Sequence, residues 1–303
     1  MNNIHSHIDN IIQSISKPQN PTRLDIILEG GLFNGSYLLG VLYYLRGLEN
    51  NNNIKIERLS GCSIGSMMAL VYFSNAFELT DIIYKITYKH FKKTCNVNIF
   101  DKIFYRLRPY ITDAVLKRIN HNLYITFYDI KTNKQIAKNV YESVDDLFDT
   151  IKKSCHCPFV VDNSLVYKKK YVDGFYPYVF PFNSSNKKIL YLNIHKFDKL
   201  ANCISIKNEK TNYTRIFDGI LDVHTFFKHK LPTSICSFVN DWSLFDYLYY
   251  YIFIQFVKLI PYLLHKLYVL NKLIRKNRIQ ITSTVYNKII RAVYVYFIKK
   301  YCI

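Results

Sequence analysis

Five residues between a predicted strand and a predicted helix constrain this chain more than any other feature. Residues 54–59 alternate apolar and polar side chains, as a strand does, and residues 64–77 form an apolar run of helical length. The turn between them reads Gly61-Cys62-Ser63-Ile64-Gly65. A Gly-x-Ser-x-Gly turn lets a strand pass abruptly into a helix, with the serine hydroxyl standing clear of the sheet. The pattern therefore predicts a nucleophile elbow at Ser63.

Glycine placement marks a second segment of interest. The loop at residues 29–35 follows a strand-like run at residues 24–28 and precedes a helical pattern at residues 36–48. Without side chains, its backbone N–H groups can approach a substrate oxyanion closely. Phosphate binding is the alternative, but neither GxGxxG nor Gly-Lys-Ser/Thr is present. Seven of the nine glycines fall in three stretches: Gly30, Gly31, Gly35 and Gly40, then Gly61 and Gly65, then Gly174.

Predicted strands and helices alternate along the first two thirds of the chain. Such alternation favours a mostly parallel sheet covered by helices. The further expected elements are a helix at residues 80–91, a hairpin of residues 123–130 and 135–140, a helix at residues 144–155, and strands at residues 165–172 and 189–194.

The chain carries a formal net charge of +19, unevenly distributed. After Asp246 there is no acidic residue, while Lys and Arg occur ten times. A basic surface favours anionic partners, which means lipid head groups or nucleic acid, although compositional drift gives the same excess. No nucleic-acid-binding module is recognisable, so we expect a lipid surface and no nucleic acid.

Cysteines and the N-terminal segment indicate an intracellular protein. The seven cysteines are an odd number without a CxxC pair, which is typical of reduced thiols and argues against a zinc ribbon. Residues 1–22 are polar and contain no apolar signal-peptide core, and we expect them to be a disordered tail.

Residues 244–270 are almost entirely apolar and aromatic. Their length suffices to cross a bilayer, but Lys258 and Pro261 interrupt the run. A helix lying in the membrane interface fits this composition, with Tyr, apolar bulk and flanking cations. Packing on the catalytic core is the main alternative, and a single C-terminal span is a third possibility.

Three motifs in the same order resemble the patatin-like phospholipases. Residues 30–42 resemble the opening loop and helix of that family, and the elbow follows at a short interval. Residues 154–159, ending Pro158-Phe159, resemble its small-residue segment. Asp173-Gly174, fifteen residues after the proline, matches its Asp-Gly motif. The resemblance covers roughly residues 24–195.

The resemblance implies a Ser–Asp dyad without histidine, calcium or another cofactor. By that resemblance Ser63 is the nucleophile and Asp173 the base, and the reaction passes through an acyl-serine intermediate. The implied oxyanion hole consists of Gly30, Gly31 and Leu32, and the implied supporting residues are Gly35, Gly61, Cys62, Ile64, Gly65 and Gly174.

Three positions depart from the family pattern. Leu32 replaces a glycine, Asn34 replaces a basic residue, and Phe175 stands where glycine or alanine is usual. These departures motivate an alternative, a catalytically degenerate protein that acts as a membrane-binding module. Histidines 156 and 195 are alternative bases, and Cys155-His156-Cys157 is too compact to form a metal site alone.

The sequence thus predicts a three-layer α/β fold with a mostly parallel sheet and a helical C-terminal region. The expected divisions are a tail at residues 1–22, a catalytic domain at residues 23–220 and a basic aromatic helical region at residues 221–303. The expected function is phospholipase A-type hydrolysis of glycerophospholipid esters at an anionic membrane surface. No oligomeric state is predicted.

Overall fold

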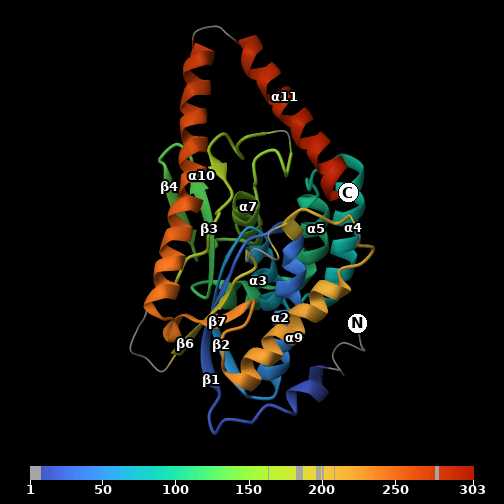
Figure 1. Cartoon of the computed structure of the whole chain (residues 1–303), viewed down its shortest axis with the longest axis vertical. Coiled ribbons are helices and arrows are strands. Elements are labelled where there is room, and N and C mark those ends of the chain that lie inside the picture. Colours follow the sequence, from blue (N-terminus) through green and yellow to red (C-terminus); the bar gives the residue numbers. More distant parts are fainter. Residues whose placement is uncertain are drawn as a thin grey trace.

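One mixed sheet organises the chain in the computed structural model, which describes residues 8–162, 164–181, 187–195, 199, 201–207, 209–276 and 280–303 (Figure 1). Within this part of the chain the sheet has seven strands. They are β1 (Thr22–Leu28), β2 (Ile54–Cys62), β3 (Leu123–Asp129), β4 (Lys134–Lys138), β5 (Tyr171–Val172), β6 (Lys187–Leu192) and β7 (Cys236–Phe238).

The centre of the sheet is parallel and its margins are antiparallel. The strand order is β4-β3-β2-β1-β6-β7, and β5 also pairs with β3. Strands β1, β2, β3 and β6 run parallel, while β4, β5 and β7 run antiparallel to their neighbours. Leu28, the last residue of β1, pairs with Gly61 on one side and Leu192 on the other. The loops after β1, β2 and β6 therefore meet at the carboxyl-terminal ends of the parallel strands, which is where α/β folds place ligand sites.

Helices cover both faces of the sheet, which confirms the predicted three-layer fold. The helices are α2 (Gly35–Asn50), α3 (Ile64–Ser74), α4 (Thr80–Thr94), α5 (Phe100–Leu107), α6 (Asp113–Ile119), α7 (Val144–Ser154), α9 (Tyr213–His229), α10 (Leu244–Lys276) and α11 (Gln280–Phe297). The side-chain alternation of β1 divides the core, because Ile26 packs with α2 and α3 while Ile27 packs with Phe180 and with Tyr250 of α10.

Two local predictions differ from the structure. Of the strand expected at residues 165–172 only β5 forms, because the chain turns at Lys168 and Lys169, both with positive φ. The expected disordered tail is in fact ordered from residue 8 onward, since Ile8 and Ile12 are buried against Gly47 of α2. Residues 1–7 lie outside the described part.

The C-terminal region is joined to the sheet rather than separate from it. Helix α9 runs through the boundary expected between residues 220 and 221, and β7 extends the same sheet beyond it. Figure 1 shows α10 and α11 as two long helices projecting past the sheet. Helix α10 is long and apolar enough to cross a membrane, and 11% of its apolar window is buried. It packs on the core along one stripe, through Tyr250 and Leu264, and leaves its other faces exposed.

Candidate active site

Ser63 occupies the sharp turn between β2 and α3. Its backbone has φ 50° and ψ −128°, a conformation that is strained for a residue with a side chain. The Ser63 N–H donates to Oγ of Ser154 at 2.9 Å. Close packing forms the turn, since a Cβ on Gly65 would lie 2.5 Å from the carbonyl oxygen of Leu28. The strand-to-helix turn expected at residues 61–65 is therefore present, with its strain held by β1 and α7.

Asp173 directly follows β5 and lies against Ser63. Its side chain is 5% exposed, and its carboxylate accepts hydrogen bonds from the Ser63 hydroxyl and from the Phe175 N–H, the latter at 2.9 Å. Burial raises the pKa of Asp173 to about 6, although both hydrogen bonds and the nearby His195 act in the opposite direction. A carboxylate with this pKa is ionised at neutral pH and is more basic than an exposed aspartate.

The end of α7 holds both halves of this pair. The Asp173 N–H donates to the His156 carbonyl at 3.0 Å, and the Gly174 N–H donates to the Ser154 carbonyl at 3.3 Å. Gly174 is pressed against β3, where a Cβ would lie 2.3 Å from the Thr126 carbonyl oxygen. Ser154 thus positions the serine through its hydroxyl and the aspartate loop through its carbonyl. Sequence reasoning noted this small-residue segment but gave Ser154 no role.

The Gly-rich loop lies against the same serine. A Cβ on Gly30 would lie 3.0 Å from the Cβ of Ser63. Gly31 has φ 143° and Leu32 has φ 42°, so a leucine occupies a left-handed position that favours glycine. Among the described residues, the N–H groups of Gly31 and Leu32 have no hydrogen-bond acceptor. N–H donors without an acceptor, in a loop that packs on Ser63 through Gly30, are of the kind that a developing oxyanion requires.

The remaining predicted support residues pack around this loop and elbow. Gly35 is in contact with Ile64, where a Cβ would lie 2.4 Å from Cγ1, and Gly61 is pressed equally closely against Gly65. Cys62 is fully buried, and its burial raises the pKa of the thiol, so it remains protonated.

A buried cluster of Glu29, Tyr191 and His195 adjoins the pair, and sequence reasoning considered only His195 of these three, as an alternative base. Glu29 is fully buried at the end of β1 and accepts a hydrogen bond from the Tyr191 hydroxyl. His195 Nδ1 lies 3.4 Å from the second carboxylate oxygen of Glu29. Burial opposes charge on His195, but Glu29 outweighs burial and raises the pKa of the imidazole. His195 therefore pairs with Glu29 and lowers the pKa of Asp173.

The segment Cys155-His156-Cys157, considered as a source of an alternative base or of metal ligands, forms neither arrangement among the described residues. His156 is buried, contacts the Ser164 hydroxyl through Nε2 at 3.2 Å, and has a pKa lowered chiefly by burial. Burial raises the pKa of the Cys155 and Cys157 thiols, so they stay neutral. The described residues contain no group of three or more His, Cys, Asp or Glu side chains that could hold a metal ion.

An apolar cavity of about 90 Å³ lies beside Ile64, the residue that follows Ser63. Its lining comes from Leu32 and Phe33 of the loop, from helices α2, α3 and α4, and from Asn212. Met67 and Met68, which with Met1 are all the methionines of the chain, also line it. Methionine is flexible and adapts its shape to a guest, so this lining can accommodate an apolar chain.

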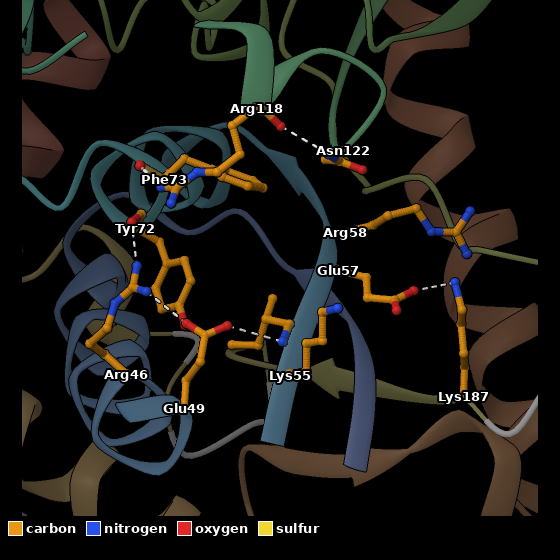
Figure 2. Close-up of a pocket in the computed structure, with 11 residues that line it drawn as sticks. Arg46, Glu49, Lys55, Glu57, Arg58, Tyr72, Phe73, Arg118, Asn122 and Lys187 are labelled. Atoms are coloured by element: carbon orange, nitrogen blue, oxygen red, sulfur yellow. Dashed lines mark hydrogen bonds and ion pairs between the residues drawn. The ribbon is translucent and has the colours of Figure 1, made fainter. Parts of the chain in front are cut away.

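A larger pocket, of about 420 Å³, lies toward the amino ends of the strands, away from Ser63 (Figure 2). Its cations are largely matched by neighbouring groups. Arg46 binds Glu49 at 2.7 Å and the Tyr72 carbonyl at 2.7 Å, and Lys187 pairs with Glu57. This pocket is a salt-bridged crevice, and neither Ser63 nor Asp173 lines it.

A known protein family matches this part of the chain. A family model described as patatin-like phospholipase matches residues 26–183, just over half of the chain. The matched segment contains the Gly-rich loop, Ser63, Ser154 and Asp173. No curated protein matches the chain.

Proposed function

Because the chain belongs to the patatin-like phospholipase family, a family of lipid acyl hydrolases, we propose that it hydrolyses glycerophospholipid esters as a phospholipase A. One observation carries the proposal. A buried carboxylate with a raised pKa, Asp173, accepts a hydrogen bond from the hydroxyl of a serine held at a strained strand-to-helix turn. This arrangement supports a Ser–Asp dyad.

In the proposed mechanism, Ser63 Oγ attacks the ester carbonyl and its proton passes to Asp173. The carbonyl oxygen becomes an oxyanion, which the N–H groups of Gly31 and Leu32 stabilise. The proton then moves from Asp173 to the departing alcohol, the lysolipid, and leaves an acyl-Ser63 ester. Asp173 next deprotonates water, which attacks that ester. As the bond from the acyl carbon to Ser63 Oγ breaks, the proton passes from Asp173 to Ser63 Oγ and the fatty acid leaves. The apolar cavity lined by Leu32, Ile64 and Met67 is the proposed site for the acyl chain.

The exposed faces of α10 support a peripheral position on anionic membranes. Phe256 is 69% exposed and Leu259 is 50% exposed. Lys258 and Lys266 are also exposed on this helix, which carries a single acidic residue, Asp246, in its first turn. Apolar side chains flanked by cations bind an anionic interface through both burial and charge. The same helix contacts the site, because the Phe253 ring packs 6.1 Å from the His195 ring.

Fatty-acid release from vesicles tests the activity. We expect the protein to release fatty acid from phosphatidylglycerol-containing vesicles in the presence of EDTA, because neither dyad residue needs a metal ion. The rate is expected to rise with pH to a plateau with a midpoint near pH 6, since Asp173 acts as a base only when ionised. A fluorophosphonate, which reacts with activated serines, is expected to label Ser63 with the same pH dependence.

Fluorophosphonate labelling distinguishes an active hydrolase from a catalytically degenerate protein that only binds membranes. A folded protein that binds vesicles but neither releases fatty acid nor reacts with fluorophosphonate would reject the hydrolase and support the membrane-binding alternative. Labelling of Ser63 without release from any phospholipid would instead reject the proposed substrate class.

Vesicle binding tests the role of α10. We expect the double variant Phe256→Asp, Leu259→Asp to bind anionic vesicles at least about tenfold more weakly, because it replaces two exposed apolar contacts by charges of the wrong sign. Hydrolysis of a soluble short-chain ester should be unchanged. The matched control is Tyr105→Asp, an 80% exposed aromatic residue on α5. Equal vesicle binding by the double variant and this control would exclude α10 as the membrane contact.

A further inference from the structure

A fully engaged arginine lies in the core behind the Gly-rich loop. Arg215, on α9, is 2% exposed, and its Nε, Nη1 and Nη2 atoms all donate hydrogen bonds. Nε donates to both carboxylate oxygens of Glu209 at 2.9 and 3.0 Å, and Nη2 donates to the Ser205 carbonyl at 2.8 Å and lies 2.8 Å from Oε1 of Glu209. Nη1 binds the Asn202 carbonyl at 2.7 Å and Oδ1 of Asn34 at 2.8 Å. Burying a guanidinium is costly, and this saturation offsets the cost.

Asn34 connects this arginine to the loop. It is fully buried at the end of the loop, and its N–H donates to the Gly31 carbonyl at 2.8 Å. Its side-chain amide donates to the Ile194 carbonyl at 3.1 Å and the Lys199 carbonyl at 2.9 Å, while Oδ1 accepts from Arg215. One amide therefore ties the loop both to the segment after β6 and to α9.

The loop needs such an external support. Gly31 and Leu32 are both in positive-φ conformations, and a leucine there is strained. Local hydrogen bonding is limited to the short turn of residues 31–35. A strained loop keeps one conformation only where surrounding contacts determine it.

Helix α9 is held rigidly enough to act as that support. It crosses α2 at very short range, since a Cβ on Gly40 would lie 2.0 Å from the Ile216 carbonyl oxygen. A Cβ on Gly219 would lie 2.2 Å from the Tyr37 carbonyl oxygen. Arg215 directly precedes Ile216 at this crossing, so its side chain extends from a fixed backbone.

We propose that Arg215 and Asn34 are positioning residues that hold the Gly-rich loop with the N–H groups of Gly31 and Leu32 aimed at the reaction centre of Ser63. The inference rests on the proposed hydrolase function. It assigns a role in that reaction to residues 202–215, which lie beyond the segment that the family model matches. The departure at position 34, an asparagine, is thereby explained, because an amide both donates to the carbonyls and accepts from the guanidinium.

Two variants test the inference. Asn34→Ala removes the side-chain amide and leaves the contacts of Arg215 with Glu209, Asn202 and Ser205 in place. Arg215→Lys keeps the positive charge but loses the planar guanidinium, which donates to several acceptors at once. We expect kcat for a soluble short-chain ester and the rate of fluorophosphonate labelling to fall about 10- to 100-fold in both, because displaced N–H donors stabilise the oxyanion less. KM should stay within about twofold, and the midpoint near pH 6 should not move, since Asp173 keeps its surroundings.

The matched control is Arg46→Met at the far end of α2. Its loss of the Glu49 and Tyr72 contacts should lower the melting temperature without changing kcat. Folded variants of Asn34 and Arg215 with wild-type kcat and labelling rate would overturn the inference and leave a purely structural arginine.

Hydrogen exchange of the peptide spanning residues 28–36 provides a readout that does not depend on turnover. We expect faster exchange there in both variants, with the rest of α2 unchanged. Unchanged exchange would overturn the positioning role. If the wild-type protein is inactive but both substitutions still speed exchange in the loop, the proposed hydrolase function is rejected. The inference that Arg215 and Asn34 hold the loop is then retained.

Discussion

Ser63→Ala and Asp173→Asn are expected to reduce fatty-acid release by roughly 10⁴-fold each, and the double variant should be no worse than either alone. The two side chains share one proton-transfer step, so removing either abolishes the same reaction path. Asparagine retains an oxygen that can accept from the Phe175 N–H, so the loop geometry at position 173 is preserved. The measurement is the initial rate on phosphatidylglycerol vesicles with EDTA.

Ser60→Ala is the control for the serine. Ser60 lies three residues earlier in β2, is fully buried, and its hydroxyl has no partner among the described residues. Its loss should leave the rate unchanged. Substantial activity in Asp173→Asn would contradict the dyad and direct attention to His195 as the base.

The effect of Asp173→Asn on stability should have the opposite sign to its effect on rate. The pKa of Asp173 rises from 3.8 to about 6 on folding. Between these values the folded state binds more protons, so ionisation of Asp173 lowers stability as the pH rises through this window, by about 3 kcal/mol in total. Removing the charge should therefore raise the free energy of unfolding at pH 7 and have little effect below pH 4. A less active but more stable variant cannot be explained by misfolding.

The strand-to-helix turn at Ser63 could be predicted from the sequence because it is a local pattern, whereas Asp173 was singled out by the family resemblance. Gly61-Cys62-Ser63-Ile64-Gly65 lies between a strand and a helix, and Asp173-Gly174 follows a short strand. The fold class could be predicted as well, because alternating strands and helices determine a parallel sheet. The hydrogen bonds that Ser154 accepts from Ser63 and Gly174 could not be predicted, since a serine at a helix end can have many other partners.

Contacts between residues that lie far apart in the sequence could not be predicted. Glu29 and His195 meet only because β1 and β6 are paired, and Arg215 reaches Asn34 over 181 residues through a helix crossing. Nothing in the local pattern of α9 distinguishes Arg215 from a surface arginine. The prediction of a strand over residues 165–172 was wrong for a local reason, because Lys168 and Lys169 both adopt positive φ and turn the chain.

Gly65→Ala is expected to destabilise the protein by about 3 kcal/mol and to reduce fatty-acid release about 100-fold in the fraction that remains folded. The new Cβ would lie 2.5 Å from the Leu28 carbonyl oxygen and 2.6 Å from that of Glu29. Both atoms are backbone at the end of β1, so they cannot rotate away. The first turn of α3 must move instead, and it carries Ser63 away from Asp173 and from the Gly-rich loop.

Gly47→Ala on α2 is the matched control, because its new Cβ also meets a neighbour at 2.5 Å. That neighbour is Cδ1 of Ile12, the far end of a flexible side chain. A rotamer change relieves the contact, and alanine is a better helix former than glycine by about 1 kcal/mol. Thermal unfolding of both variants beside their rates measures the difference. Equal, small effects would mean that the elbow tolerates displacement, and the strained turn at Ser63 would then lose its role in fixing the distance to Asp173.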